Sequence, residues 1–195
     1  PNPSTSAATW TASTGHTVSG DWLGWIRAHG DVDTVGLPRT NVIRDPATGQ
    51  QVQYFQRVIL EYHPENSGDQ RFQRRLLGDS LYPGADPPVG ASNPPPGPAR
   101  YFPAASGGTP TGLGHFVADY TRSGQYVGFK SFFDSHGGVA VLGFPKEEPK
   151  LRDGLWTQRF QAGVLQYHSG NPPGYRVQLE LVGDEYIKAK GLGYA

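Results

Sequence analysis

The sequence predicts a mainly β protein of the α+β class, built from two tandem homologous modules that are joined by a linker rich in proline and glycine. One observation is an internal repeat, in which a segment of the chain recurs about 105 positions later without a gap. A second is that each copy contains runs of β-forming residues. A third is the proline-rich stretch between the copies, at 87–88 and 94–98. Each module is therefore expected to be a short helix followed by a small antiparallel sheet.

The repeat is clearest in the segment that begins at Gly49 and again at Gly154. The pattern Gly-x3-Gln-x-Phe-Gln-x3-Leu-x-Tyr-His-x2-Asn covers residues 49–66 and recurs over 154–171. Upstream, Val-Gly-Leu-Pro at 35–38 corresponds to Leu-Gly-Phe-Pro at 142–145. Duplicated modules favour binding surfaces or building blocks, whereas an enzyme usually concentrates its chemistry in one asymmetric cleft.

The chain is expected to have four parts: a tail over 1–19, a first module over 20–82, a linker over 83–114 and a second module over 115–195. The tail is composed of small, β-tolerant residues with almost no charge, so it is predicted to be extended. It either lies on its own modules or adds a donor strand to a neighbouring subunit, with Trp10 as an aromatic anchor. The expected subunit contacts are Ala7, Ala8, Thr9, Trp10, Thr11 and Ala12.

Each module is predicted to open with a helix. Apolar residues at 22, 23, 25 and 26 lie at helical spacing before Gly30, and Ser19 or Asp21 could cap the helix. In the second module the corresponding residues are Tyr126, Val127 and the phenylalanines at 129, 132 and 133.

Strands are predicted after each helix. Residues 51–62 and 156–167 are predicted to form paired strands, and a third strand is expected over 71–77 and 175–182. In the second of these, Tyr175, Val177, Leu179 and Leu181 alternate with polar residues and are expected to be buried. The linker holds too much proline for a regular element throughout, so we expect an interdomain strap or an interaction segment.

The residues that match between the copies are expected to have structural roles. His29 and His136 end the predicted helices and are expected to be caps. Most aromatic residues are expected in the core, although exposed rings could stack on sugars. The remaining matched pairs are His63 and His168, Phe55 and Phe160, Gly36 and Gly143, and Pro38 and Pro145.

Motifs of catalysis are missing from the sequence. It contains no Gly-x-Ser-x-Gly elbow, no phosphate loop and no short-spaced zinc motif, and Asp31-Val32-Asp33 is only a fragment of a calcium loop. The neighbouring Glu147 and Glu148 are expected in a solvated turn. We therefore predict a protein that is not an enzyme, with no catalytic, cofactor-binding or metal-binding residues and no cofactor.

The amino-acid composition limits the classes of partner that the chain is expected to bind. Lys plus Arg equals Asp plus Glu at 17 each, so no net field attracts nucleic acid. The absence of Cys excludes disulfides and thiolate metal sites, and no apolar run approaches the ~20 residues that span a bilayer. Because the chain begins at Pro1 rather than Met, we expect that an export signal has been removed and that the protein is extracellular or on the cell surface.

Leu142-Gly143-Phe144-Pro145, with Gly137-Gly138 before it and Asp153-Gly154 and Phe160 after it, resembles the LGFP repeat. The first module is similar to a divergent copy, with Val35 and Leu37 within the motif. LGFP repeats occur in exported bacterial proteins and are thought to attach to, or organise, the cell envelope. The resemblance implies a surface location and supplies no catalytic residue.

Two functions remain open. The leading hypothesis is a non-enzymatic extracellular structural subunit that assembles with itself into a filament or surface layer through its modules and tail. The alternative is a cell-wall or polysaccharide-binding module that presents Gln53, Gln56, Asn66 and their counterparts to an envelope glycan, with duplication providing avidity.

Overall fold

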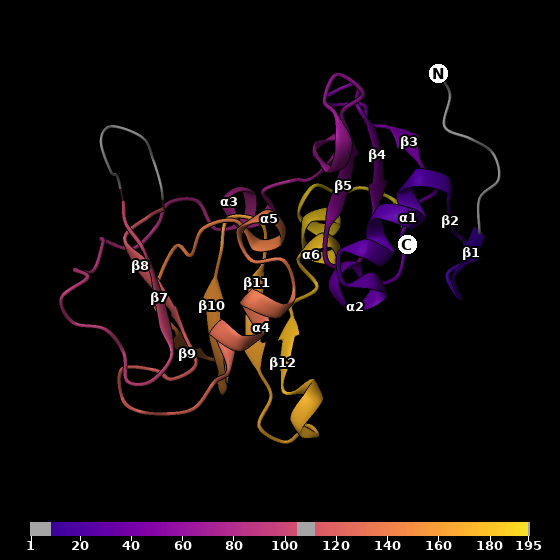
Figure 1. The fold of residues 1–195 in the computed structure, drawn as a ribbon. Coiled ribbons are helices and arrows are strands. Elements are labelled where there is room, and N and C mark those ends of the chain that lie inside the picture. The colour runs from indigo at the N-terminus through magenta and orange to yellow at the C-terminus, as the bar shows by residue number, and fades with distance from the viewer. Residues whose placement is uncertain (1–8, 105–111, 195) are drawn as a thin grey trace. The chain divides into compact units, whose positions relative to one another are not determined.

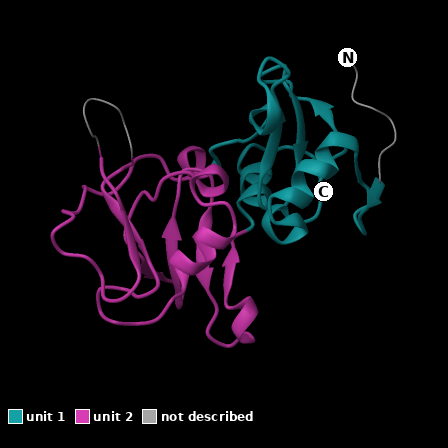
Figure 2. Cartoon of the chain, in the orientation of Figure 1, with its two compact units in different colours: residues 1–77, 181–195 teal, residues 78–180 magenta. Residues whose placement is uncertain are grey.

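A computed structural model describes residues 9–104 and 112–194. The chain has mixed α+β content, with several small antiparallel sheets and few helices (Figure 1). It divides into two compact units (Figure 2). Unit 1 comprises residues 1–77 and 181–195, and unit 2 comprises residues 78–180.

Unit 1 contains a four-stranded antiparallel sheet in the order β3-β4-β5-β6, and a separate hairpin of β1 and β2. The strands are β1 (Thr9–Thr11), β2 (Thr17–Ser19), β3 (Ile43–Arg44), β4 (Gln51–Tyr54), β5 (Ile59–Tyr62) and β6 (Phe72–Arg74). The helices are α1 (Gly20–Ala28), α2 (Asp31–Val35) and α6 (Val182–Ala189), together with the 3-10 turn η1 (Gly68–Arg71).

The predicted first helix is present as α1. Its Leu23, Trp25 and Ile26 are buried and pack with Val35 and Phe55 in the core of unit 1. Ser19 occupies the N-cap position in an extended conformation but makes no side-chain capping bond, so packing rather than capping stabilises this helix.

Unit 2 contains a four-stranded antiparallel sheet in the order β12-β11-β10-β9, and a pair of strands, β7 and β8. The strands are β7 (Ala99–Phe102), β8 (His115–Ala118), β9 (Lys150–Arg152), β10 (Leu155–Arg159), β11 (Val164–Tyr167) and β12 (Val177–Leu179). The helices are α3 (Leu77–Leu81), of which residues 78–81 lie in unit 2, α4 (Phe129–Ser135) and α5 (Val139–Leu142), together with the 3-10 turn η2 (Pro173–Tyr175).

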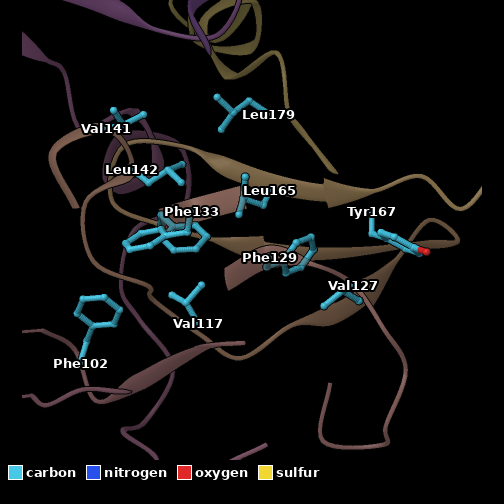
Figure 3. Close-up of a cluster of buried hydrophobic side chains, with 11 residues drawn as sticks. Phe102, Val117, Val127, Phe129, Phe133, Val141, Leu142, Leu165, Tyr167 and Leu179 are labelled. Carbon is cyan, nitrogen blue, oxygen red and sulfur yellow. The ribbon is translucent and has the colours of Figure 1, made fainter. Parts of the chain in front are cut away.

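The core of unit 2 is mostly aromatic and aliphatic side chains from α4, α5 and the sheet (Figure 3). Phe129 and Phe133 of α4 are fully buried, and Phe133 stacks on Phe160 with 5.6 Å between ring centroids. Burial of such rings is the main source of stabilisation in a small unit without disulfides.

Some predicted boundaries are wrong. The third strand of the second repeat is only β12, because Pro172 and Pro173 begin a 3-10 turn that places Tyr175 outside the strand, 66% exposed. Leu181 is 40% exposed, and of the four residues predicted to be buried in this strand only Leu179 is buried, so the predicted alternation is wrong. Helix α4 begins at Phe129, so Tyr126 and Val127 precede it.

The predicted linker contributes to unit 2 over its described residues. Strand β7 lies within it and pairs with β8 in antiparallel register. The amide of Asp86 donates to the carbonyl of Lys146, and the amide of Val89 donates to that of Gly114. The bond to Lys146 and the pairing of β7 with β8 connect the segment to the rest of the unit, and the bond to Gly114 lies within the segment. Among residues 9–104 and 112–194, the structure contains no helix with the length and apolar character of a membrane span.

Candidate interaction sites

The repeated glycine of the Leu-Gly-Phe-Pro motif packs against a repeated glutamine. Gly36 and Gly143 have φ of +76° and +72°, and a Cβ at either would lie 2.7 or 2.8 Å from the Cβ of Gln56 or Gln161. The Oε1 of Gln56 accepts the amide of Leu37 at 2.9 Å, as Gln161 accepts that of Phe144 at 3.0 Å. Glycine is therefore required twice over, for its backbone angle and for the space it leaves.

The proline of the same motif forms a β-bridge to the repeated phenylalanine. Pro38 bridges to Phe55 and Pro145 bridges to Phe160, both antiparallel. Both phenylalanines have no exposed surface. The matched glycine, proline and phenylalanine thus lie together in each unit, at the turn between β4 and β5 or between β10 and β11. The matched His63 and His168 instead follow β5 and β11.

Two further glutamines are buried and bonded to backbone. Gln53 donates through Nε2 to the carbonyls of Thr17 and Thr40, and Gln158 donates to those of Phe116 and Glu147. Neither side chain is exposed. Gln53 and Gln158 are therefore unavailable to a glycan, contrary to the expectation from sequence. Among the other residues expected at that site, Gln56 contacts Leu37, as described above.

The histidines that match between the two copies hydrogen-bond to residues close to them in the chain. His29 and His136 are the C-caps of α1 and α4, and each Nδ1 lies 2.8 Å from the carbonyl four residues earlier, Trp25 or Phe132. A carbonyl only accepts, so Nδ1 carries the proton. This confirms the predicted caps.

His63 contacts Glu65 at 2.9 Å and His168 contacts Gln166 at 3.2 Å. Within the part of the chain that the structure describes, no three His, Cys, Asp or Glu side chains cluster as metal ligands do.

Each unit also holds a helix against the turn just described. We call Arg39 with Phe55–Gln56 the helix-receiving site of unit 1, and Lys146 with Phe160–Gln161 that of unit 2. In unit 1 the amide of Asp184 in α6 donates to the carbonyl of Gln56 at 3.1 Å.

In unit 2 the amide of Asp79 in α3 donates to the carbonyl of Gln161 at 2.9 Å. The preceding glycines, Gly183 and Gly78, lie against the carbonyls of Phe55 and Phe160.

An ion pair closes each helix-receiving site. Arg39 donates two hydrogen bonds to the carboxylate of Asp184, at 2.8 and 2.7 Å, and this pairing raises the pKa of Arg39. Lys146 is buried, contacts Asp79 at 2.7 Å and donates to the carbonyl of Tyr82 at 2.6 Å. Both sites therefore combine a backbone bond, a close glycine and a salt bridge.

The acidic pair at 147–148 is not solvated, contrary to prediction. Glu147 is buried and accepts two hydrogen bonds from Arg152, at 2.7 and 2.6 Å. Glu148 accepts the amide of Phe116 at 2.9 Å. A buried carboxylate is stable only when paired, and β9 supplies the pairing arginine that sequence reasoning overlooked.

Unit 2 also has a cleft of about 300 Å³ beside α4, with Tyr126, Phe132, His136, Tyr167 and Arg176 among its lining residues. Tyr126 is 43% exposed and meets Tyr167 edge-on, with 6.3 Å between ring centroids. Burial first, and then the nearby Asp119, raise the pKa of Tyr126, so its hydroxyl stays protonated at neutral pH. The cleft offers an aromatic surface beside hydrogen-bonding groups.

The matched positions of unit 1 carry larger side chains. Trp25 and Phe72 stand where the cleft of unit 2 has Phe132 and Val177, and the centroids of their rings lie 6.0 Å apart. Tyr62 packs on Phe72. The two repeats therefore share a framework and differ at this surface.

The tail residues that the structure describes lie on their own unit. Thr9, Trp10 and Thr11 pair with β2, Trp10 packs against the core of unit 1, and Ala12 is buried. This matches the own-module alternative for these residues. Ala7 and Ala8 lie outside the described residues.

Comparisons with known proteins found no family model and no curated protein that matches the chain. The resemblance to LGFP repeats therefore stays a prediction. The helix-receiving sites were missed from sequence, although the signal was present: the Gly-Asp pairs at 78–79 and 183–184 match in the repeat. The exposed Tyr126 and Tyr175 were assigned to the core and gave no such signal.

Proposed function

We propose that this chain is a non-enzymatic structural subunit at the cell surface, made of two tandem homologous modules, that assembles with copies of itself into a filament or layer. The observation that carries the proposal is the use of the repeated side chains. The repeated glycine, proline, glutamine and phenylalanine residues of the motif contact one another in both units. Duplication has thus preserved a framework, as expected of a building block.

The sheets also offer edges for assembly. In the four-stranded sheets the outer strands are β3 and β6 in unit 1 and β9 and β12 in unit 2. Leu151 on β9 is 60% exposed, so this outer strand presents an apolar side chain at the edge of the sheet. A strand from another copy could extend such an edge.

The donor-strand role of the tail belongs to the same proposal. Because Thr9–Thr11 already pair with β2, the hairpin would have to open for these residues to pair with another copy. Val18 of β2 is fully buried, so removing residues 1–19 would damage the core of unit 1. A deletion that tests the tail should stop before β1.

Electron microscopy of the purified chain, beside a variant that lacks residues 1–8, tests this function. Filaments or sheets formed by the full chain are the expected result, and their loss in the shortened variant would assign the connection to the tail. Monodisperse particles of the full chain at all concentrations, confirmed by sedimentation velocity, would rule out the proposed self-assembly.

A second candidate is polysaccharide binding, which the cleft of unit 2 favours. Aromatic faces suit the C–H surfaces of sugar rings, and Arg176 and His136 add polar groups at the same surface. Titration of purified envelope polysaccharide with Y126A and R176A tests it: each should weaken binding at least tenfold. R71A, at the matched position of unit 1, is the control, and equal losses in all three variants would argue against the cleft.

A further inference from the structure

The two repeats exchange their last helices. Helix α3 follows the last strand of the first repeat, β6, yet its residues 78–81 belong to unit 2. Helix α6 follows the last strand of the second repeat, β12, yet it belongs to unit 1. Each compact unit is therefore completed by a helix that the other repeat supplies.

The two helix-receiving sites are equivalent in detail. Each accepts the amide of an aspartate that follows a glycine, and each pairs that aspartate with a cation, Arg39 or Lys146. These contacts depend on the sequence of the helix and of the turn. The same contacts can form whether the helix and the turn belong to one molecule or to two, and this is the condition for exchange between copies.

The connections that lead into the helices are short and carry exposed leucines. Two residues separate β6 from α3, and two separate β12 from α6. The second residue of each connection is a leucine, Leu76 or Leu181, which is 45% or 40% exposed. Short connections favour exchange of the helix between chains over its return to the same chain. Covering the exposed leucines with another chain would also stabilise the exchanged form.

Helix α6 is better suited to exchange than α3. The residues after α6 also pack on unit 1, where Tyr194 meets Tyr54 with 4.9 Å between ring centroids, so α6 and its continuation form one contiguous segment. After α3, the chain makes backbone bonds within unit 2 at Asp86 and Val89. Withdrawal of α3 would disturb those contacts as well.

We propose that α6 of one copy occupies the helix-receiving site of unit 1 in a second copy, so that the exchange within one chain opens into an exchange between chains. This inference rests on the proposed self-assembly and names its connector. The monomer, in which α6 occupies its own chain's site, and the exchanged form, in which it occupies another chain's site, contain the same helix contacts. The equilibrium between them therefore depends on protein concentration and on new contacts at the two-residue connections. Because each copy donates one α6 and receives another, the copies can propagate head to tail into a filament or close into a ring or dimer.

Cysteine cross-linking tests the exchange. The chain has no Cys of its own, so only the introduced cysteines can react. The variants R39C and D184C are mixed in equal amounts, unfolded, refolded together at high concentration, and treated with a bismaleimide about as long as an arginine–aspartate pair. A two-chain product is expected only if α6 of the D184C copy enters the site of the R39C copy. The double variant R39C/D184C, at low concentration, should give an intrachain product and thereby show that the site still folds.

Two controls test whether the cross-link reports binding of α6 at the helix-receiving site. T48C mixed with D184C should give no two-chain product, because Thr48 lies in the turn before β4, outside the helix-receiving site. G183A in the D184C chain should remove the product, since a Cβ there would lie 2.0 Å from the carbonyl of Phe55.

The outcomes separate the two proposals. Two-chain products that depend on Gly183 support the exchange. A second outcome is that filaments form while the double variant gives only intrachain products and the mixed single variants give no two-chain product. That result would overturn the exchange and leave the proposed self-assembly standing. A two-chain product without larger assemblies supports the exchange as a closed dimer and counts against the filament.

Discussion

Gly183 lies so close to the carbonyl oxygen of Phe55 that a Cβ at position 183 would come within 2.0 Å of it. Gly78 has the same relationship to Phe160, at 1.9 Å. Neither glycine has a left-handed φ, so the requirement is for space alone. The obstacle is backbone rather than a flexible side chain, and it can yield only if the helix moves.

We therefore expect G183A to destabilise unit 1 and G78A to destabilise unit 2, each by about 2–3 kcal/mol, because an extra methyl group forces the helix out of its site. Urea unfolding monitored by circular dichroism measures the change. G24A, in α1 with nothing within 4 Å of the added Cβ, is the control and should stabilise the protein by about 0.5–1 kcal/mol. Equal effects at all three positions would contradict close packing at the receiving sites.

The pair Arg39–Asp184 should couple energetically. Its two hydrogen bonds at 2.8 and 2.7 Å join partly buried side chains. A double-mutant cycle with R39A, D184A and R39A/D184A is expected to give a coupling free energy of about 1 kcal/mol. The exposed pair Lys130–Asp134, at i and i+4 in α4, provides the comparison and should give no more than about 0.5 kcal/mol. A coupling at Arg39–Asp184 below that of the control pair would argue against a role in holding α6.

Sequence reasoning predicted the elements whose signals are local. The apolar spacing of Leu23, Trp25 and Ile26 identified α1, and the runs at 51–62 and 156–167 identified the two central hairpins. It missed α3 and α6, because they are only five and eight residues long and gain stability from the turns on which they pack.

The site could be predicted only in part for a similar reason. The repeat indicated which residues matter structurally, such as Gly36 and Phe55, because duplication retains what both copies need. It could not indicate that Gln53 faces inward to Thr17 and Thr40, since strand register decides which face a residue takes. The exposure of Tyr126 depends on where α4 begins, and helix boundaries are the least certain feature of a sequence pattern.

Arg74 offers a test of a difference between the repeats. It is buried where the second repeat has Leu179, and burial lowers its pKa to about 10. It donates to Thr34, at the position matched by Val141, and stands over the ring of Trp25 at 5.7 Å. Its Nε has no hydrogen-bond partner among the described residues.

We expect the double variant R74L/T34V, which installs the residues of the second repeat, to stabilise unit 1 by about 1 kcal/mol, because it replaces a buried charge with apolar packing. R74A should instead destabilise by about 2 kcal/mol or more, because it leaves a cavity. Chemical unfolding of the three proteins decides this. A less stable double variant would show that the contacts of Arg74 outweigh its desolvation.

The buried Asp45 predicts how unit 1 responds to acid. Burial acts to raise its pKa, but hydrogen bonds from Arg75 and from the amide of Ala47, with the charge of Arg75, outweigh it and lower the pKa. The pKa of an aspartate in the unfolded chain is about 3.9. Below that pH the unfolded chain binds a proton at Asp45, whereas the folded chain binds it only at lower pH. The stabilisation from Asp45 is thus complete above that pH and is lost as the pH falls through its folded pKa.

D45N should therefore be less stable than the parent protein at pH 7, with a difference that shrinks as the pH falls below about 4. Arg75 keeps its hydrogen bond to Glu61 at 2.6 Å in this variant, so the fold should survive. Urea unfolding at several pH values between about 2 and 7 measures the difference. D69N, at an exposed aspartate, should follow the parent protein throughout. A constant gap between D45N and the parent protein across this range would mean that the charge of Asp45 does not contribute to stability.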